Sequence, residues 1–199
     1  MQRIRPVGKK SNNCEGTMEH WLEKYRYCPA CGSDRFVESS VKSKRCEVCG
    51  LEVFMNASAS NVAVITRDGD DGRKNLLVVR RAKEPARGTL DLPGGFADAD
   101  ETAEEGVCRE VKEETGLTVV RATYLFSEVN RYSYGGLTIP TQDLFFHCEV
   151  ADFTDLKAMD DAADYQWIAL DELHPDQFGL ASVRRGVVKI LKKIEKTHI

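Results

Sequence analysis

Residues 94–116, GGFADADETAEEGVCREVKEETG, decide the fold class of this chain and hold eight acidic residues. Thr102 and Glu105 have the spacing of a capping box, in which each side chain accepts a hydrogen bond from the other residue's backbone. Gly116 stands where a helix stop is expected, because glycine readily adopts the left-handed conformation of a C-terminal cap. The stretch therefore predicts a helix over Ala103–Thr115.

The charged residues of this helix do not keep to one solvated face. Its apolar stripe, spaced i, i+4, i+8, consists of Ala103, Val107 and Val111. At about 100° per residue, Glu110 and Glu114 fall within about 60° of Val107, and Glu113 stands beside Glu110. A solvated face, the usual reason for a charge run, would lie opposite the stripe. Partly shielded carboxylates repel one another unless a cation lies among them, so we favour a site for Mg²⁺ or Mn²⁺.

The composition is that of a soluble protein with one core and a small module: 199 residues, 42% hydrophobic, 30% charged, net charge −4. This mild acidity argues against nucleic-acid binding as the main function. No apolar run reaches the roughly 18 residues of a membrane helix, and the N-terminus lacks the apolar centre of a signal peptide. We expect a cytoplasmic protein without a membrane partner.

Four of the seven cysteines form two Cys-x-x-Cys pairs, Cys28 with Cys31 and Cys46 with Cys49. A glycine follows each pair and lets the backbone turn around a bound ion. Four thiolates suit tetrahedral Zn²⁺ and leave no open position for catalysis, so we expect a structural zinc site. Two redox-active pairs are the alternative, but they belong with a βαβ pattern that is absent here. The odd cysteine count also favours a reducing compartment.

The rest of the chain predicts strands and a second helix. The strands are expected over 61–68, 75–82, 118–134, 141–153 and from 165 onward, and the helix over 182–196. This mixture predicts an α/β layered domain. We divide the chain into an N-terminal tail (1–24), a zinc ribbon (25–54), a linker (55–60) that runs into the larger domain, and that domain itself (57–199).

The acidic stretch resembles the signature of the Nudix family. The match is Gly95-x5-Glu101-x7-Arg109-Glu110-Val111-x-Glu113-Glu114-x-Gly116-Leu117, and the flanks LDLPGGF and YQWIALDEL also look like Nudix surroundings. The resemblance spans about residues 57–180. A zinc ribbon ahead of such a domain is similar to the arrangement in NADH pyrophosphatases. The resemblance implies a Nudix-type α/β/α sandwich with a mixed sheet.

The activity that the resemblance implies is hydrolysis of a nucleoside diphosphate linked to another moiety, with Mg²⁺ or Mn²⁺. The implied metal ligands are Glu110, Glu113 and Glu114, with the backbone carbonyl of Gly95. Arg109 would orient the carboxylates, and Glu101 would pair with it or support the loop. The chemistry is consistent, because water that attacks a charged pyrophosphate needs metal ions to neutralise charge and a carboxylate to take the proton.

Two details of the implied site stay open. The proton acceptor is either Glu110 or a carboxylate of a later loop, for which MDDAAD offers Asp160, Asp161 and Asp164 unless this loop is merely solvated. Tyr132 and Tyr134 are candidates for stacking on a nucleobase, or belong to an ordinary strand before a glycine turn. The proline- and tryptophan-rich signature of NADH pyrophosphatases is missing after the box, so ADP-ribose or a dinucleotide is our expected substrate.

Two other classes of function remain as alternatives. In the first, a metabolite-sensing regulator binds without cleaving, and the ribbon contacts nucleic acid through SSVKSKR (39–45) or binds a partner. Its three basic residues supply little positive charge for binding a phosphate backbone. In the second, the ribbon is a docking surface or the contact of a homodimer. The intact glutamate set favours the hydrolase, whose partner is a small nucleotide substrate.

Overall fold

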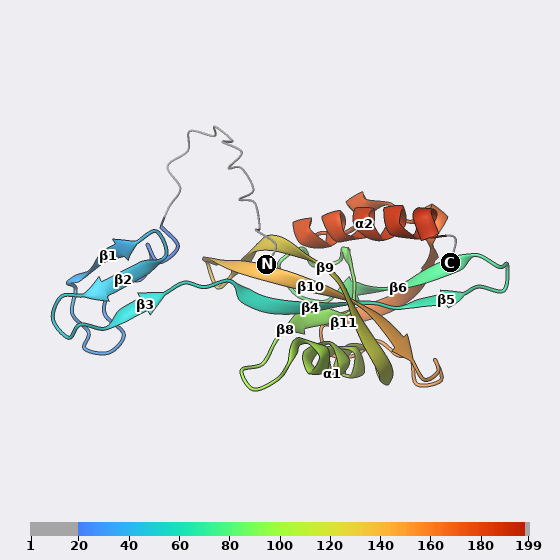
Figure 1. Ribbon diagram of the computed structural model, residues 1–199, viewed down its shortest axis with the longest axis horizontal. Helices are drawn as coiled ribbons and strands as arrows, with labels where there is room; N and C mark the ends of the chain where they lie inside the picture. The colour runs from blue at the N-terminus through green and yellow to red at the C-terminus, as the bar shows by residue number, and fades with distance from the viewer. Residues whose placement is uncertain (1–19, 198–199) are drawn as a thin grey trace, which may run out of the picture. The chain divides into compact units, whose positions relative to one another are not determined.

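The computed structural model describes the backbone of residues 20–197 and the side chains of residues 20–193. Most of the predicted tail, residues 1–19, lies outside the described residues. The described part of the chain divides into two compact units, with the boundary between Phe54 and Met55 (Figure 1). Within residues 20–197, no helix has the length and apolar character needed to cross a membrane.

The smaller unit is a three-stranded antiparallel sheet in the order β1-β2-β3. Its strands are β1 (Phe36–Ser40), β2 (Ser43–Cys46) and β3 (Glu52–Phe54). Its core of fully buried residues consists of Cys28, Phe36 and Cys46. Structure begins before residue 25, because Leu22 is buried and Nε2 of His20 donates to the backbone oxygen of Ser40 at 2.7 Å. The ribbon therefore includes the end of the segment that we predicted as a tail.

The larger unit contains two four-stranded arrangements. The first is a mixed sheet with the order β8 (Gly94–Phe96), β4 (Ser58–Val64), β10 (Leu137–Val150), β9 (Val119–Tyr134). Only β4 and β10 pair in parallel within it. The second is antiparallel, with the order β11 (Ala162–Ala169), β6 (Lys74–Arg81), β5 (Thr66–Asp68), and β7 (Leu90–Asp91) also pairs with β6. Two 3₁₀ turns, η1 (Leu170–Glu172) and η2 (Pro175–Gln177), follow β11.

Two helices cover the strands from opposite sides: α1 (Ala103–Thr115) and α2 (Ala181–Thr197), as Figure 1 shows. Alternation along each strand sends neighbouring side chains to opposite helices. Val62, for example, packs in the core that α2 closes, whereas Ala63 packs in the core that α1 closes. The predicted α/β/α sandwich with a mixed sheet is confirmed.

The ends of α1 are formed by the residues that the sequence indicated. The Thr102 hydroxyl accepts from the backbone N–H of Glu105, and the Glu105 carboxylate accepts from that of Thr102. Gly116 is left-handed with φ 73°, and its N–H donates to the carbonyl of Lys112. These local bonds satisfy backbone groups that a helix leaves unpaired at its ends. They fix the start of α1, and with it the direction in which its glutamates point.

The observed strands differ from the predicted ones at several bounds. Strand β10 begins at Leu137 and ends at Val150 instead of spanning 141–153, and β11 begins at Ala162 instead of 165. Two further differences involve β4. The segment 61–68 is divided at Ile65 between β4 and β5, so it contributes to both sheets. Strand β4 begins at Ser58, so half of the predicted linker 55–60 is strand. The physical reason is pairing: β10 offers a parallel partner from Ser58 onward, and this long-range contact leaves no trace in the local sequence.

Candidate active site

A cavity of about 340 Å³ lies within the larger unit, between its two sheets and beside α1. One end is lined by the glutamates of α1 and by strand β8. The other end is lined by side chains of β4, β6, β9 and β10 and by the start of α2. The cavity therefore joins a strongly acidic end to an end of mixed chemistry.

Arg109 holds the acidic end together through five hydrogen bonds. Its guanidinium binds Glu101 through two nitrogens, at 2.7 and 3.0 Å, and donates to the backbone oxygen of Phe96 at 3.1 Å. Its Nη1 atom also donates to Glu110 at 2.8 Å and to Glu113 at 2.9 Å. One cation thus orients three carboxylates and the chain segment ahead of the helix.

Glu101 has the electrostatic character of a permanent anion. The hydrogen bonds from Arg109, followed by that from the backbone N–H of Asp98, lower the pKa of Glu101 to about 2. The carboxylate therefore stays ionised under all ordinary conditions. It fixes the position of Arg109 on one side while leaving the other side of the guanidinium for the glutamates of the cavity.

Glu110 and Glu114 differ from Glu101, because burial is the main influence on the pKa of each. Burial raises the pKa of Glu110, and the neighbouring Arg109 opposes the rise. Glu114 is only 6% exposed, accepts from the backbone N–H of Gly94 at 3.0 Å, and has its pKa raised to about 8, mainly by burial. Carboxyl groups that are costly to ionise in their present surroundings are suited to receive a cation.

The three glutamates line one cavity, but their oxygens are not gathered around a point. Among the described residues, the four cysteines are the group of three or more potential ligands whose ligand atoms all lie within 4.8 Å of one another. Glu110 and Glu113 instead share the guanidinium of Arg109. The sequence predicted that a cation lies among these carboxylates. In the structure, the guanidinium of Arg109 supplies part of that positive charge.

Two glycines bring the β8 backbone close to these carboxylates. A Cβ atom on Gly95 would lie 2.5 Å from Oε1 of Glu110, so any side chain would occupy the place of that carboxylate. Gly94 has φ 152°, and a Cβ atom there would lie 2.0 Å from the backbone oxygen of Asn61. The backbone of Gly95 thus stands directly beside Glu110, as a carbonyl ligand of a shared ion would.

The mixed end of the cavity contains residues that sequence reasoning missed. Arg81 and Asp91 form an ion pair at 2.5 Å, and Nη2 of Arg81 donates to the Tyr132 hydroxyl at 3.4 Å. The rings of Tyr132 and Phe96 meet edge to face at 5.4 Å. Asp143 also lines the cavity from β10. A signal was present, because a lone aspartate within apolar runs such as LDLP and QDLFF is unusual for a solvated residue.

The remaining predicted residues are divided between the cavity and the surface. Tyr132 lines the cavity, whereas Tyr134, nearer the hairpin turn, is 66% exposed and does not. Asp160 and Asp161 line it, and Asp161 forms an ion pair with Lys83. Asp164 lies within β11 opposite Arg80 and does not line the cavity. Two of the three loop aspartates and one of the two tyrosines therefore line the same cavity as the glutamates of α1.

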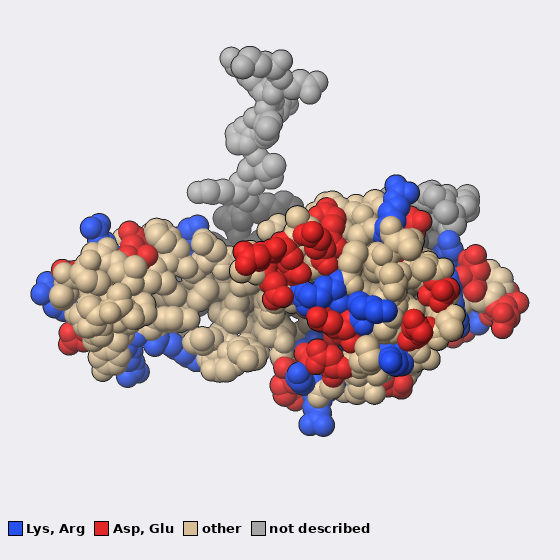
Figure 2. Space-filling view, turned by 90° about the horizontal axis from the view of Figure 1, so that it is seen from below, with Lys and Arg blue, Asp and Glu red and all other residues tan. Residues whose placement is uncertain are grey.

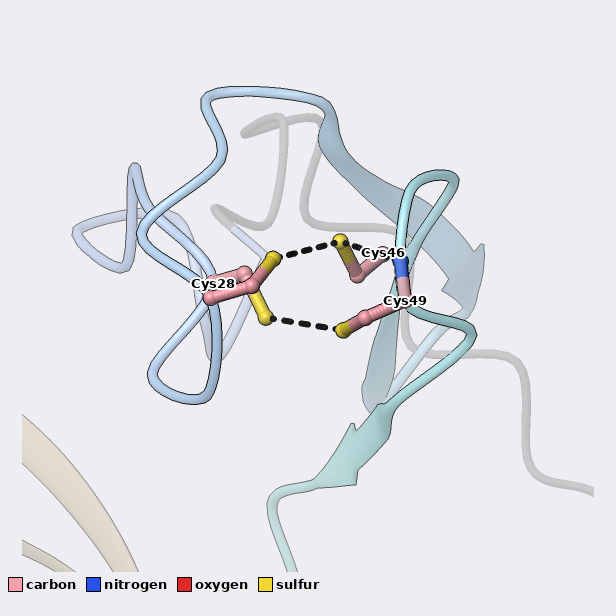
Figure 3. A group of neighbouring side chains, drawn as sticks. Cys28, Cys46 and Cys49 are labelled. Carbon is pink, nitrogen blue, oxygen red and sulfur yellow. Dashed lines mark hydrogen bonds between the residues drawn. The ribbon is translucent and has the colours of Figure 1, made fainter.

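The four paired cysteines converge in the smaller unit. The labelled sulfur atoms in Figure 3 point toward one another from two loops, and the Sγ atoms of Cys28 and Cys49 are 3.6 Å apart, as are those of Cys31 and Cys46. A disulfide needs about 2.05 Å. A tetrahedron with Zn–S bonds of about 2.3 Å has edges of about 3.8 Å. The spacing therefore fits a zinc ion and does not fit two disulfides.

Both cysteine loops have the same backbone turn. The N–H of Gly32 donates to the carbonyl of Cys28 at 2.9 Å, and that of Gly50 donates to Cys46 at 3.0 Å. Each glycine has a positive φ, 72° and 77°, which other residues adopt with strain. The backbone N–H of Cys49 points at Sγ of Cys46 and lowers the pKa of that thiol to about 6.

The family of the larger unit follows from comparison with known sequences. The sequence model of the family described as NUDIX domain matches residues 57–189, more than half of the chain. The chain belongs to the Nudix family. The acidic helix α1 and strand β8, with Gly94 and Gly95, lie within the matched residues.

Curated relatives of this Nudix protein include NAD-capped RNA hydrolases named NudC. That of Pseudomonas aeruginosa is 28% identical over 155 residues, which cover 78% of this chain and 51% of the relative. That of Stutzerimonas stutzeri is 26% identical over 153 residues, which cover 77% of this chain and 51% of the relative. The chain therefore spans about half the length of the curated relatives that it matches.

Solved structures agree with the Nudix fold. A NUDIX hydrolase from Nitrosomonas europaea superimposes with a TM-score of 0.65 at 20% identity, covering 87% of this chain and 93% of its own. A MutT NUDIX hydrolase from Burkholderia pseudomallei gives 0.55 at 26% identity, covering 68% and 98%. The NUDIX domain of Shewanella oneidensis NrtR, solved in complex with ADP ribose, gives 0.54 at 21% identity, covering 73% and 91%.

The surface near the acidic helix carries both signs of charge. Seen from the side on which α1 lies, acidic side chains gather around a smaller group of basic ones (Figure 2). An extended basic face of the kind that tracks a nucleic-acid backbone is not visible in that view.

Proposed function

We propose that this Nudix protein is a metal-dependent hydrolase that cleaves the pyrophosphate bond of a nucleoside diphosphate linked to another moiety. The observation that carries this proposal is the arrangement at the acidic end of the cavity. There, the buried Glu114 and the half-buried Glu110 lie beside the close backbone approach of Gly94 and Gly95. Such a site suits a hard divalent cation and a phosphate group, and has no evident structural purpose without them.

The residues present fit Mg²⁺ or Mn²⁺. Glu110, Glu113 and Glu114 would hold the ions, with the backbone carbonyl of Gly95 as a further ligand. When bound, such ions neutralise charge on the pyrophosphate oxygens and acidify a coordinated water. Arg109 keeps the carboxylates of Glu110 and Glu113 turned toward the cavity, and Glu101 keeps Arg109 in place.

The proton of the attacking water needs a carboxylate within reach. Glu110 is one candidate, and its raised pKa makes it a better proton acceptor than an exposed glutamate. Asp160 and Asp161 line the same cavity from a loop and are the other candidates. Between these two, Asp160 is the stronger, because Lys83 already pairs with Asp161.

The substrate class rests on the relatives and on the size of the cavity. The matched relatives are named as hydrolases of NAD-capped RNA, and one structural neighbour was solved with ADP ribose. Each of these molecules contains two groups joined by a pyrophosphate. A cavity of about 340 Å³ is large enough for a nucleotide-sized group. We therefore propose ADP-ribose or a dinucleotide as substrate.

The zinc ribbon has a structural part in this proposal. Its three-residue core is too small to hold about thirty residues in one fold, and a bound ion would supply the missing stability. A closed set of four cysteine ligands leaves no position for a substrate or water. Zn²⁺ would therefore take no part in the hydrolysis.

The proposal is tested by a hydrolysis panel with Mg²⁺ or Mn²⁺. The substrates are NADH, NAD⁺, ADP-ribose, diadenosine polyphosphates, nucleotide sugars and deoxynucleoside triphosphates, with released products coupled to a phosphatase. Glu110→Gln and Glu114→Gln should abolish turnover, whereas Glu104→Gln, which removes an exposed carboxylate from the same helix, should not. Binding of these compounds without any turnover would favour the metabolite-sensing alternative.

A further inference from the structure

The cavity also contains a buried carboxyl group, that of Asp143, to which the proposed chemistry assigns no role. Asp143 lies there at 4% exposure, in the middle of β10. Its side chain shares a face of the strand with Thr141 and with Phe145, which packs in the core that α2 closes. A carboxyl group in such a place is costly to bury unless it serves a purpose.

The partners of Asp143 are neutral. The Thr141 hydroxyl donates to its Oδ1 at 2.7 Å. Among the described residues, no lysine or arginine forms an ion pair with it, in contrast to Asp91, which is paired with Arg81. Burial accordingly raises the pKa of Asp143. This end of the cavity therefore holds the carboxyl groups of Asp143 and Asp91 and the guanidinium of Arg81. The excess of carboxyl groups disfavours the binding of a ligand's phosphate or carboxylate at this end.

Two buried polar side chains of this region, Ser182 and Asn61, have no partner at hydrogen-bonding geometry. Ser182, near the start of α2, is fully buried and close enough to lower the pKa of Asp143, but its Oγ has no partner at hydrogen-bonding geometry. Within the described residues, the only other buried side-chain atoms without a partner belong to Asn61, which lines the cavity. Unsatisfied buried polar groups are rare in folded proteins. Ser182 does not line the cavity, so the group that is open to a ligand is the amide of Asn61.

The walls of this end are flat or apolar. Phe96 and Tyr132 form an edge-to-face pair on one side, and Leu180 and Val183 line the cavity from the start of α2. Aromatic and aliphatic walls around one buried acceptor are suited to a planar heterocycle that carries a hydrogen-bond donor.

We infer that the Asp143 carboxyl group accepts a hydrogen bond from the exocyclic amino group of a nucleobase, so that the pocket selects an amino-bearing purine over its keto counterpart. This inference rests on the proposed function, because it assigns the nucleoside half of the same substrate. A keto oxygen in place of the amino group would set two acceptors against each other. A site built for one hydrogen-bonding pattern discriminates strongly against the analogue that cannot make it.

The first test measures binding and does not depend on turnover. The protein is titrated calorimetrically with AMP and with IMP, which share the ribose and phosphate and differ in the amino or keto group. We expect AMP to bind about 10- to 100-fold more tightly, in line with one lost hydrogen bond to a buried partner. Equal affinity for AMP and IMP in the wild-type protein would overturn the inference.

Asp143→Asn supplies the decisive variant, because an amide has the same shape and can donate to a keto oxygen as well as accept from an amine. The preference for AMP should fall to within about threefold. Glu149→Gln, which removes an exposed carboxylate from the same strand, should keep it. Retention of the full preference in Asp143→Asn contradicts the inference. If circular dichroism shows Asp143→Asn unfolded, Thr141→Val, which removes the hydroxyl that orients Asp143, is measured instead and should reduce the preference.

A parallel assay separates this inference from the proposed function. ADP-ribose and its hypoxanthine counterpart are offered to the wild type and to Asp143→Asn, with Mg²⁺ present. The change in the kcat/KM ratio should come mostly from KM, because Asp143 belongs to β10 and is none of the proposed metal ligands, which come from α1 and β8. If neither compound is hydrolysed, the result counts against ADP-ribose as the substrate in the proposed function, whereas the AMP and IMP titrations still decide the role of Asp143.

Discussion

Arg109 grips Glu101 with two parallel hydrogen bonds, from Nε to Oε2 at 3.0 Å and from Nη2 to Oε1 at 2.7 Å. This fork leaves the Nη1 atom for Glu110 and Glu113. The planar guanidinium can serve both sides at once because its donors lie in fixed directions. A lysine, whose charge is a single point, cannot.

We therefore predict that Arg109→Lys lowers kcat by about 100-fold with little change in KM, since small displacements of catalytic groups have effects of this size. The measurement is steady-state kinetics on the best substrate of the panel. Arg121→Lys, on an exposed pair with Glu149, is the matched control and should be silent. A KM effect without a kcat effect would show that Arg109 binds substrate instead of orienting carboxylates.

Substitution of the two glycines of β8 should separate stability from activity. A Cβ atom on Gly95 meets the end of a flexible glutamate side chain, so Gly95→Ala should fold with a stability change below about 1.5 kcal/mol. Activity should still fall by about 100-fold, because Glu110 is displaced.

Gly94→Ala should lower the stability of the protein much more than Gly95→Ala does. Its Cβ atom would meet backbone at Asn61, which cannot move independently, and we expect a loss of more than about 3 kcal/mol. Urea unfolding of both glycine variants provides the comparison. Similar losses of stability in Gly94→Ala and Gly95→Ala would mean that the Glu110 side chain cannot move aside for the new methyl group any more than the Asn61 backbone can.

The buried Glu114 should make the metal-free protein less stable as the pH rises. Its pKa is raised in the folded protein from about 4.5 to about 8. Between these values, the unfolded chain releases the proton while the folded protein retains it, so stability is lost with increasing pH. The upper bound is about 5 kcal/mol.

Urea midpoints of the chelated protein at pH 5 and pH 8 measure this effect. Glu114→Gln should remove this part of the pH dependence, and saturating Mg²⁺ should also reduce it for the wild type. A wild type and a Glu114→Gln variant with the same pH profile would indicate that Glu114 ionises normally in the folded state.

The zinc site makes a prediction that is confined to the smaller unit. We expect one zinc ion per chain by metal analysis, and none in Cys46→Ser. In that variant, hydrogen exchange should accelerate in β1–β3 but not in α1, because the ribbon has a core separate from those of the larger unit. Loss of protection throughout the chain would contradict this separation.

The sequence predicted α1 to the residue because its ends depend on neighbours close in the chain. Thr102 and Glu105 cap one end and Gly116 the other, and both caps formed as expected. The layered fold was also predictable, since strands and helices carried clear periodicities. The glutamates of α1 were brought to a common cavity wall, and the cysteine pairs converged.

Other features depend on contacts that no local pattern encodes. The division of 61–68 at Ile65 arises because β4 pairs with β10 while β5 pairs with β6. The pair of Arg81 with Asp91 joins β6 to β7, and Asp143 reaches the same cavity from β10. Each needed the pairing of strands to be known before its position could be assigned.

The guanidinium of Arg109 already occupies positions among the carboxylates that divalent ions would share. Cation binding here is then an exchange of partners more than the filling of an empty site. Glu110 and Glu113 need not be oriented when the ion arrives, since an internal counterion already holds both carboxylates in place. Loading should thus cost little conformational entropy, and affinity should be set by competition between a fixed organic cation and a mobile inorganic one.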